Sequence, residues 1–275
     1  MVKKKITSKV ICTVLVAVFA LMFAMPLVWM VLASFKSTNE VFAQNWLPSV
    51  WKWQNYVTVW TNETVYLPRV FLNTLSIVIF GTGGQLIVSS LAAYAFAKIN
   101  FKGREVIFTL FLGSMMIPAQ ATIIPRFILF YEIGLYNNLS ALILPSWFGV
   151  TSIFLLRQFY IGLPNELMEA AKMDGAGHLR IFAQILMPLT KPAMISTMIL
   201  SFISLWNDYL SALIFLVNKK LYTVAQAVRF WLFDDAQRYE LTMATASIFI
   251  VPVIILFVFC QRYFVEGIAT SGVKG

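Results

Sequence analysis

The chain is poor in charge and in the residue types that build reactive sites. Only 12% of its 275 residues are charged, and it contains one histidine and two cysteines. It has no GxxxxGK[ST] segment, so it lacks the Walker loop that holds the phosphates of ATP. HExxH and GxSxG are also absent, and one histidine leaves little for a metal centre or a catalytic triad. These absences argue against an enzyme, and we expect His178 to be a surface hydrogen-bonding residue.

Neither cysteine has a partner at a recognisable spacing. Cys12 and Cys260 both lie in apolar runs, without a CxxC pair or an extracellular cysteine cluster. We therefore expect two buried free thiols rather than a disulfide or a metal site. Low-complexity segments, Pro/Gly-rich linkers and shifts in composition are absent too, which predicts a single transmembrane domain over residues 1–275.

Apolar sequence is what the chain has in abundance. Apolar residues make up 60% of it and its mean hydropathy is +0.79. A water-soluble domain of this length could not hide that much apolar surface in one core. We predict an all-α integral membrane protein with six transmembrane helices. The spans are expected at about 10–33, 70–97, 106–124, 139–159, 192–217 and 241–264.

The net charge of +9 indicates membrane orientation rather than a nucleic-acid partner. The basic residues are spread along the chain instead of forming one stripe or tail. With both termini in the cytoplasm, thirteen Lys and Arg residues fall in cytoplasmic segments and eight in extracytoplasmic ones. This excess favours that orientation. The basic N-terminus precedes a long apolar run without a cleavage site, which predicts an uncleaved anchor.

Small residues mark a predicted contact between helices in the second span. Ser89, Ala93 and Ala97 recur every fourth residue on one helical face, after glycines at 81, 83 and 84. Small side chains let helix backbones approach closely in a membrane. We expect this face to pack against another span, with a pore lining as the alternative.

Tryptophan is concentrated between the first two spans, at positions 46, 51, 53 and 60. Tryptophan is favoured at the membrane–water interface. This pattern predicts an interfacial aromatic belt, and contact with an external partner is the alternative.

A polar segment of about 160–190 stands between two apolar spans. Pro164-Asn165 is typical of a helix start, and acidic residues in the first turn complement the helix dipole. We expect an amphipathic helix whose inner face carries Leu163, Leu167, Ala170 and Ala171 and whose outer face carries Glu166, Glu169 and Lys172. Asp174-Gly175 predicts a turn, followed by a second helix at about 179–187.

The residue order in this segment resembles the EAA loop of ATP-binding-cassette (ABC) importer permeases. Glu169-Ala170-Ala171 is followed after three residues by Gly175 and after nine more by Ile185. Met187-Pro188 stands where the family usually has Leu-Pro. Trp206-Asn207-Asp208-Tyr209 resembles the fifth-span signature of carbohydrate permeases. The chain end, Gly272-Val273-Lys274-Gly275, resembles that of MalG-like, maltose-type subunits, with Ser271 where Gly is frequent.

This resemblance to a carbohydrate ABC importer permease covers essentially the whole chain and implies a set of partners. It implies the type I importer architecture in a bacterial or archaeal cytoplasmic (inner) membrane. A second, MalF-like permease would complete the sugar path, and two copies of a cytoplasmic ATPase subunit would bind ATP and Mg. No cofactor is expected in this chain itself. The implied ATPase-coupling residues are Glu166, Glu169, Ala170, Ala171, Asp174 and Gly175.

The remaining expectations concern the chain end, one buried acid and one loop. Residues 272–275 either reach between the ATPases or form an exposed basic tail. Asp208 lies in an apolar span, so it should face a partner or a water-filled cavity. With Trp206, Asn207 and Tyr209 it would line a sugar path, or else it makes a structural polar contact. The loop at 218–240 would dock an extracytoplasmic solute-binding protein through Trp231, Asp234, Asp235 and Arg238, or pack on its own spans.

Other functions remain open on the residues alone. An ion-coupled secondary transporter is the first alternative, and a membrane enzyme and a structural scaffold follow. A secondary transporter favours several carboxylates near the midplane and a detectable internal repeat. The sequence offers only Asp208 and no convincing repeat.

Overall fold

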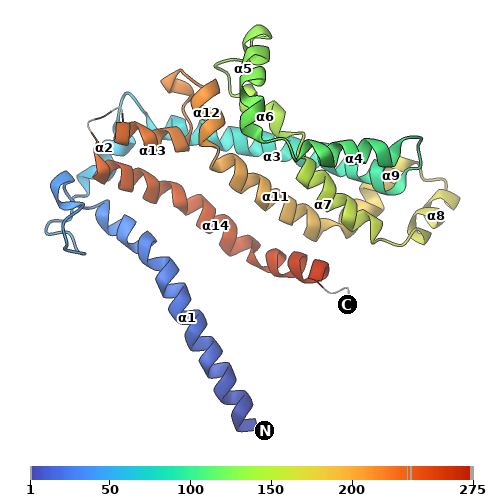
Figure 1. The fold of residues 1–275 in the computed structure, drawn as a ribbon, viewed down its shortest axis with the longest axis horizontal. Helices are drawn as coiled ribbons and strands as arrows, with labels where there is room; N and C mark the ends of the chain where they lie inside the picture. Colours follow the sequence, from blue (N-terminus) through green and yellow to red (C-terminus); the bar gives the residue numbers. More distant parts are fainter. Residues whose placement is uncertain (1, 234, 236, 273–275) are drawn as a thin grey trace. The chain divides into compact units, whose positions relative to one another are not determined.

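The computed structural model describes residues 2–233, 235 and 237–272, and within them every regular element is a helix (Figure 1). The expected all-α fold is confirmed. The chain divides into two compact units, each described by itself. Unit 1 comprises Met1–Leu67 and Ala227–Val251, and unit 2 comprises Pro68–Gln226 and Pro252–Gly275. A single domain over 1–275 stays a prediction.

The α-helices are α1 (Val2–Ala33), α2 (Gln54–Thr61), α3 (Leu67–Lys98), α4 (Arg104–Ser114), α5 (Ile123–Glu132), α6 (Ser140–Ser146), α7 (Val150–Ile161), α8 (Glu166–Met173), α9 (His178–Ile181), α10 (Met187–Leu189), α11 (Lys191–Trp206), α12 (Tyr209–Phe215), α13 (Val224–Phe233) and α14 (Tyr239–Gly272). Short 3-10 turns are η1 (Thr38–Glu40), η2 (Ala119–Thr122) and η4 (Lys219–Leu221). One π-helical turn, η3 (Phe182–Leu186), joins α9 to α10.

Four helical stretches are long and apolar enough to cross a membrane: Lys9–Ala33, Leu67–Lys98, Ser140–Ile161 and Tyr239–Gln261. Two bent pairs raise the number to six if each pair is one span. The pair Arg104–Ser114 and Ala119–Glu132 bends by 93°, and the pair His178–Leu189 and Lys191–Trp206 bends by 80°. The first bend falls within the predicted span 106–124, whereas the second falls between the predicted helix 179–187 and the predicted span 192–217.

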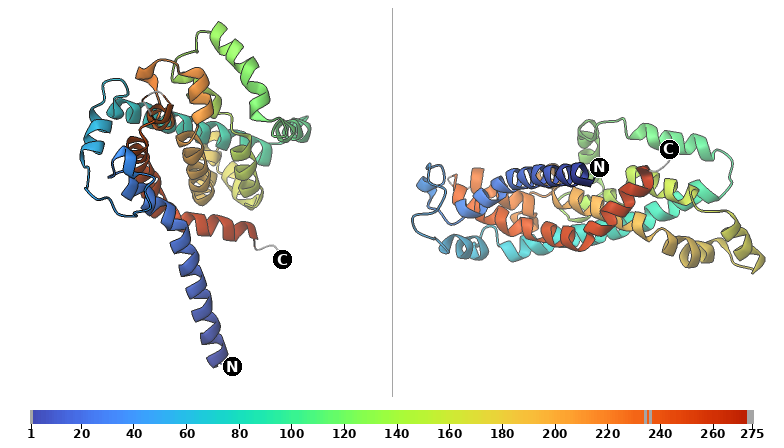
Figure 2. Two further views of the ribbon diagram at one scale, coloured as in Figure 1. Left: turned by 60° about the vertical axis from the view of Figure 1, so that its left-hand side comes forward. Right: turned by 90° about the horizontal axis from the view of Figure 1, so that it is seen from below.

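The bend between α4 and α5 follows from Pro118. This residue has ψ of 132°, outside the helical range, and its ring nitrogen has no hydrogen to continue a helical ladder. Figures 1 and 2 show α5 leaving α4 at a corner. The predicted span 106–124 therefore ends as a helix at Ser114, and α5 continues in a new direction to Glu132.

The predicted span 192–217 is also interrupted. Helix α11 ends at Trp206, and Asp208, with ψ of 87°, leaves the helical region. The Asp208 carboxylate accepts a hydrogen bond from the Ser211 backbone N–H at 3.0 Å and so caps α12. A short acidic side chain at this position stabilises a helix start, which is why the chain restarts here rather than continuing.

In unit 2 the small residues of α3 bring other helices close. Ser89 and Ala93 are fully buried, which confirms the predicted contact face. A Cβ added to Gly84 would lie 2.0 Å from Trp147 Nε1, and one added to Gly81 would lie 2.7 Å from a Leu205 methyl carbon. Glycine therefore permits the approach of the α6–α7 junction and of α11. Helices α7 and α11 lie side by side in the same unit (Figure 1).

In unit 1 the chain turns sharply after α1. Phe35 packs against the rings of Trp51 and Trp53, with ring centroids 5.2 and 4.7 Å away. Helix α1 itself is covered by none of the described residues over its most apolar stretch. Cys12 is a free thiol as predicted, but it is exposed, and Cys260 is only half-buried. The burial expectation was wrong because an apolar run reads the same whether it faces a protein core or lipid.

Candidate functional site

Helix α8 begins where the end of α3 holds it. The Lys98 ammonium donates hydrogen bonds to the Leu163 carbonyl oxygen and to Asn165 Oδ1, both at 2.7 Å. Glu166 and Glu169 then place two exposed carboxylates in the first turn, where they complement the helix dipole. A cation on α3 therefore fixes the position of an acidic, outward-facing helix.

The inner face of α8 differs from the predicted one. Met168 and Ala171 are buried, 5% and 8% exposed, whereas Leu167 is 40% exposed and Ala170 is exposed as well. The prediction counted Leu163 into the helix, but the helix begins only at Glu166. The inward stripe therefore starts at Met168 and repeats at Ala171, three residues later.

The end of α8 is closed by a glycine that no other residue type replaces without strain. Gly175 has φ of +77°. Its N–H donates to the Lys172 carbonyl oxygen at 3.0 Å, and the Ala176 N–H donates to the Ala171 carbonyl oxygen at 2.9 Å. This pair of bonds is the Schellman arrangement, which needs a left-handed residue at the position of Gly175. The predicted turn at Asp174-Gly175 is confirmed.

An apolar cluster lies beneath this loop, and we name it the loop-base cluster. Its fully buried members are Ala93 of α3, Leu156 and Tyr160 of α7, Ile181 of α9 and Leu186 of the π turn. Met168 packs into it from α8, as do Tyr94 and Phe96 from α3. Three helices and the loop thus share one core, which ties α8 to the ends of α3 and α7.

His178 closes the edge of the loop-base cluster. Its Nδ1 lies 2.9 Å from the hydroxyl oxygen of the buried Tyr94. The His178 side chain is exposed on its other side, so the expectation of a surface hydrogen-bonding histidine is confirmed. The contact joins the start of α9 to α3.

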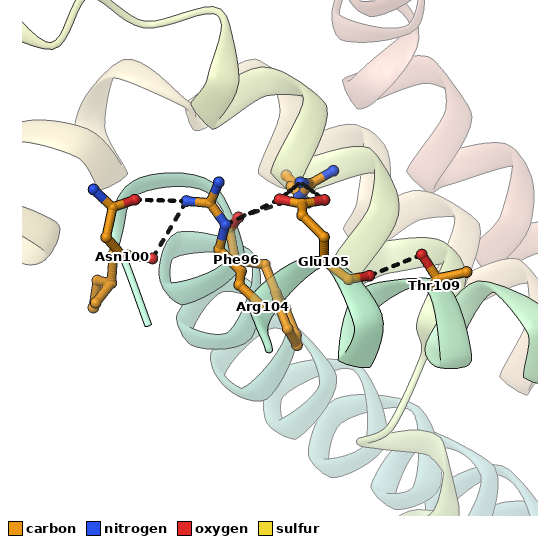
Figure 3. Close-up of polar contacts among 7 residues, drawn as sticks. Phe96, Asn100, Arg104, Glu105 and Thr109 are labelled. Atoms are coloured by element: carbon orange, nitrogen blue, oxygen red, sulfur yellow. Dashed lines mark hydrogen bonds and ion pairs between the residues drawn. The ribbon is translucent and has the colours of Figure 1, made fainter. Parts of the chain in front are cut away.

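A charged contact braces the same end of unit 2. Arg157 Nη2 lies 3.1 Å from both carboxylate oxygens of Glu105, and the Arg157 guanidinium carbon lies 4.0 Å from the ring centroid of Phe108. Arg157 Nε also donates to the Phe96 carbonyl oxygen at 3.2 Å. Figure 3 shows Glu105 and Arg104 beside Phe96 and Asn100. Arginine thus fastens α7 to both α3 and α4.

Unit 2 also contains a cavity of about 430 Å³, which we name the polar pocket. Its polar lining comes from α3, α5, α6, α7, α11 and α12: Gln85, Arg126, Ser146, Thr151, Ser152, Ser201, Ser204, Asp208 and Ser211. Gln85 Nε2 donates to Ser152 Oγ at 2.8 Å, and Arg126 Nη2 donates to Ser211 Oγ at 3.2 Å. Gln85 lies near the middle of α3, so the cavity reaches into the apolar spans.

Some polar atoms around the polar pocket have no protein partner. Arg126 Nε and Ser201 Oγ are buried and make no hydrogen bond within the described part of the chain. The Arg126 guanidinium carbon lies 4.7 Å from the Phe215 ring centroid, which holds the side chain in place. Buried donors and acceptors of this kind require water or a polar solute.

Of the four residues predicted for a sugar path, only Asp208 lines the polar pocket. Trp206 is 4% exposed and stacks on Phe202, with ring centroids 5.4 Å apart and planes at 9°. Asn207 is exposed and its side-chain N–H donates to the Ile203 carbonyl oxygen. The predicted aromatic plate is therefore absent from the described lining of this pocket. Sequence reasoning missed Arg126, which falls among the eight Lys and Arg residues of the predicted extracytoplasmic segments.

The chain end and the 218–240 loop bear on the other predictions. Gly272 is the last residue of α14, while Val273, Lys274 and Gly275 lie outside the described residues, as does Asp234. Trp231 is 1% exposed, so its ring is buried in the chain rather than facing a partner. The Arg238 backbone N–H donates to the Trp231 carbonyl oxygen at 2.9 Å.

Comparisons with known proteins agree with these features. The family described as binding-protein-dependent transport system inner membrane component matches residues 85–270. The arabinooligosaccharides transport system permease protein AraQ of Bacillus subtilis is 32% identical over 97% of this chain and 96% of its own length. The melibiose/raffinose/stachyose import permease protein MelC of the same species is 31% identical over 96% of each chain.

A solved structure is similar along nearly the whole chain. It is a crystal structure of a bacterial ABC transporter involved in the import of the acidic polysaccharide alginate. The two chains superpose with a TM-score of 0.82 at 25% identity, covering 94% of this chain and 96% of the other. These findings rule out the ion-coupled alternative. The chain belongs to the binding-protein-dependent inner membrane components, as a multi-pass permease subunit of a carbohydrate ABC importer of the MalG-like type.

Proposed function

We propose that this permease moves a sugar or oligosaccharide inward, driven by two cytoplasmic ATPase subunits, one of which binds α8. A second, MalF-like permease completes the path, and the partner ATPases bind ATP and Mg and hydrolyse the nucleotide. The observation that carries the proposal is an exposed acidic helix seated on a rigid buried cluster. Such an element is built to receive force from a partner and pass it into the spans.

The outer surface of α8 and its turn favours a protein partner. Met173 is 85% exposed and Leu179 is 76% exposed, in a loop that is otherwise polar. Exposed apolar side chains gathered beside charge are typical of interaction surfaces. In the proposed complex the α8 helix inserts into an ATPase cleft, and Glu169 pairs with a basic residue there. Glu166, Ala170, Ala171, Asp174 and Gly175 shape the same inserted element.

The loop-base cluster supports a lever mechanism. Helices α3, α7 and α11 each contribute to the cluster at one end, through Tyr94, Leu156 and Ala193. The same three helices line the polar pocket, through Gln85, Ser152 and Ser201. A shift of α8 on ATPase closure therefore reorients the pocket lining, because packed helices move as bodies rather than deforming continuously.

The polar pocket is the proposed sugar-facing surface of this subunit. Sugar hydroxyls both donate and accept hydrogen bonds, and Asp208, Arg126 and Gln85 offer acceptor and donor groups in one cavity. Asp208 would accept from a hydroxyl, and Arg126 would donate to one. Trp206 would support this surface by packing, and Asn207 and Tyr209 would line the path beyond the pocket. The names of AraQ and MelC, both sugar transporters, support the substrate class.

The proposed orientation places both termini and α8 in the cytoplasm. The excess of Lys and Arg in those segments supports it. The segments at 34–66 and 218–240 then lie outside, where a solute-binding protein docks, with Asp235 and Arg238 as candidate contacts. The chain end from Gly272 through Val273, Lys274 and Gly275 would meet the ATPases from the cytoplasmic side.

Reconstituted transport tests the proposal. The full complex is placed in proteoliposomes that enclose ATP and Mg, the solute-binding protein is added outside, and uptake of labelled arabinotriose, raffinose and maltotriose is followed. We expect ATP-dependent uptake of at least one sugar, and its loss in Glu169→Lys but not in Glu132→Lys, which changes an exposed residue at the end of α5. Uptake that persists without ATP, or that is insensitive to Glu169→Lys, would refute the coupling.

A further inference from the structure

One oxygen of a buried carboxylate in unit 1 has no hydrogen-bond partner within the described part of the chain. Glu240 is 2% exposed at the start of α14, and its Oε1 lies 3.0 Å from Arg238 Nε. Its Oε2 is buried and makes no hydrogen bond within the described part of the chain. A buried carboxylate oxygen without a donor is unfavourable by about 1–3 kcal/mol or more. Something with an O–H or N–H group is expected to meet it.

A small cavity of about 210 Å³ adjoins Glu240. It is lined by Ser37, Thr38, Asn39, Lys52, Asn55, Arg238 and Glu240. Every one of these residues is polar, and all belong to unit 1. The volume lies below the range of about 300–1,000 Å³ that is typical for sites of drug-sized ligands. The cavity therefore suits one small polar group. We name it the Glu240 pocket.

Hydrogen bonds hold the wall of the Glu240 pocket in shape. The buried Asn55 amide donates to the carbonyl oxygens of Ser34 and Lys36 at 2.8 and 2.9 Å, and the Lys52 N–H donates to the Phe35 carbonyl oxygen at 2.9 Å. The fully buried Lys36 ammonium donates to the Asn45 carbonyl oxygen at 2.5 Å. A wall fixed by such bonds is a preorganised site rather than a collapsed loop.

The next segment of the loop is fixed in the same way. The Ser49 backbone N–H donates to Glu40 Oε1 at 2.7 Å. Hydrogen bonds from the side chain and backbone of Ser49 lower the pKa of Glu40 below its usual value. Glu40 therefore stays ionised and hydrogen-bonded to Ser49. This bond holds the end of the segment that carries Ser37, Thr38 and Asn39.

The chemistry of the lining suits a group that both donates and accepts hydrogen bonds. Glu240 Oε2 accepts only, whereas the Lys52 ammonium and the Arg238 guanidinium donate only. Two adjacent hydroxyls of a sugar ring fit, because one donates to Glu240 Oε2 while the other accepts from Lys52 or Arg238.

We propose that the Glu240 pocket binds one sugar ring through adjacent hydroxyl groups, forming a second saccharide site that shares no residue with the polar pocket. That the ligand is a saccharide rests on the proposed function. Aromatic surface adjoins the site: Phe42 is 67% exposed, and its ring centroid lies 4.8 Å from that of Tyr239, the neighbour of Glu240. An exposed ring offers the apolar face on which the C–H groups of a sugar pack.

Cysteine protection tests the site locally. The full transporter is purified in nanodiscs, with Cys12→Ala and Cys260→Ala removing the native thiols and Thr38→Cys placing a thiol in the Glu240 pocket. The modification rate by a small methanethiosulfonate reagent is measured with and without millimolar arabinotriose, raffinose or maltotriose, with betaine at equal osmolality as control. A parallel Ser204→Cys variant reports on the polar pocket. The solute-binding protein is added in a separate arm.

We expect at least one of the three sugars to slow modification of Thr38→Cys, and Glu240→Gln to weaken that protection by about tenfold in sugar concentration, because glutamine removes the charge of the hydrogen-bond acceptor. Glu132→Gln, at an exposed residue of unit 2, leaves protection unchanged. Co-purification of Glu240→Gln with the partner subunits shows that it folds.

Two results would overturn the Glu240 site. One is no sugar protection at Thr38→Cys, or protection that Glu240→Gln does not alter. The other is protection by the solute-binding protein alone, which would assign the cavity to protein docking. Either result leaves the proposed function standing if the complex still takes up sugar with ATP, so the two failures are distinguishable.

Discussion

The loop-base cluster and the polar pocket lie on the same helices of unit 2 but are built in opposite ways. The cluster is mostly apolar and closely packed, with Leu156, Ile181 and Leu186 fully buried, and its buried Tyr160 hydroxyl is an exception that makes no hydrogen bond within the described part of the chain. The pocket leaves Arg126 Nε and Ser201 Oγ buried without a partner. Closely packed side chains transmit a displacement from one helix to the next, whereas buried polar atoms without a partner can hydrogen-bond to a polar solute. In the proposed function the cluster receives force from the ATPase and the polar pocket contacts the sugar.

The largest effect is expected from Gly84→Ala, which disturbs the close approach between α3 and the α6–α7 junction. In Gly84→Ala the new methyl group meets the Trp147 ring, whose Nε1 is held by the Phe80 carbonyl oxygen at 3.0 Å. We expect a loss of stability of about 1–3 kcal/mol, the usual range for overpacking. Thermal unfolding of the purified complex measures it. Gly83→Ala is the matched control, since its Cβ meets nothing within 4 Å, and equal unfolding temperatures would contradict the packing.

Gly175→Ala perturbs only the turn after α8, which is part of the proposed ATPase-coupling loop. The new Cβ meets no atom within 4 Å, so its whole effect comes from the positive φ, about 1–2 kcal/mol for a non-glycine residue. We expect slower ATP-driven sugar uptake with an unchanged affinity for sugar, because the pocket is untouched. Gly177→Ala serves as the control, because φ at Gly177 is −73°. Equal uptake rates in the two variants would show that the turn geometry does not matter.

Asp208→Asn changes only the polar pocket. Asparagine also caps helices, so the start of α12 survives while the charged acceptor is lost. We expect a higher KM for sugar, by up to about tenfold, with the ATPase response to the solute-binding protein retained. Steady-state uptake over a range of sugar concentrations measures the change. An unaltered KM would remove Asp208 from the sugar path.

The smallest effect is expected from Arg157→Lys, which weakens the contact of residue 157 with Glu105 and Phe108 without removing it. Lysine keeps the charge but loses the second hydrogen bond and the planar stacking on Phe108. Because Glu105 is 61% exposed, we expect a loss of only about 0.5–1 kcal/mol, smaller at high salt. Thermal unfolding at two salt concentrations tests it, with Arg104→Lys for comparison. A drop as large as that of Gly84→Ala would mean that the charge pair carries the packing.

Sequence alone predicted the local features of these regions better than the long-range ones. The turn at Gly175 and the small face of α3 followed from residue types with strong steric preferences. The inner face of α8 was misplaced because it depends on where Asn165 lets the helix begin. The polar pocket went unseen because Arg126, Gln85 and Asp208 are distant in sequence. They come together only in the folded unit, where the chain turns at Pro118 and restarts as α12 after Asp208.

The central claim is that α8 lies in the cytoplasm and contacts the ATPase. Its most direct test places a cysteine at Glu169, in a chain without Cys12 and Cys260, and cross-links the assembled transporter in sealed, inside-out membrane vesicles. We predict labelling of position 169 by a membrane-impermeant maleimide in these vesicles and a cross-link to the ATPase subunit that changes in yield when ATP is bound. Labelling only in right-side-out vesicles, with no ATPase adduct, would contradict the account.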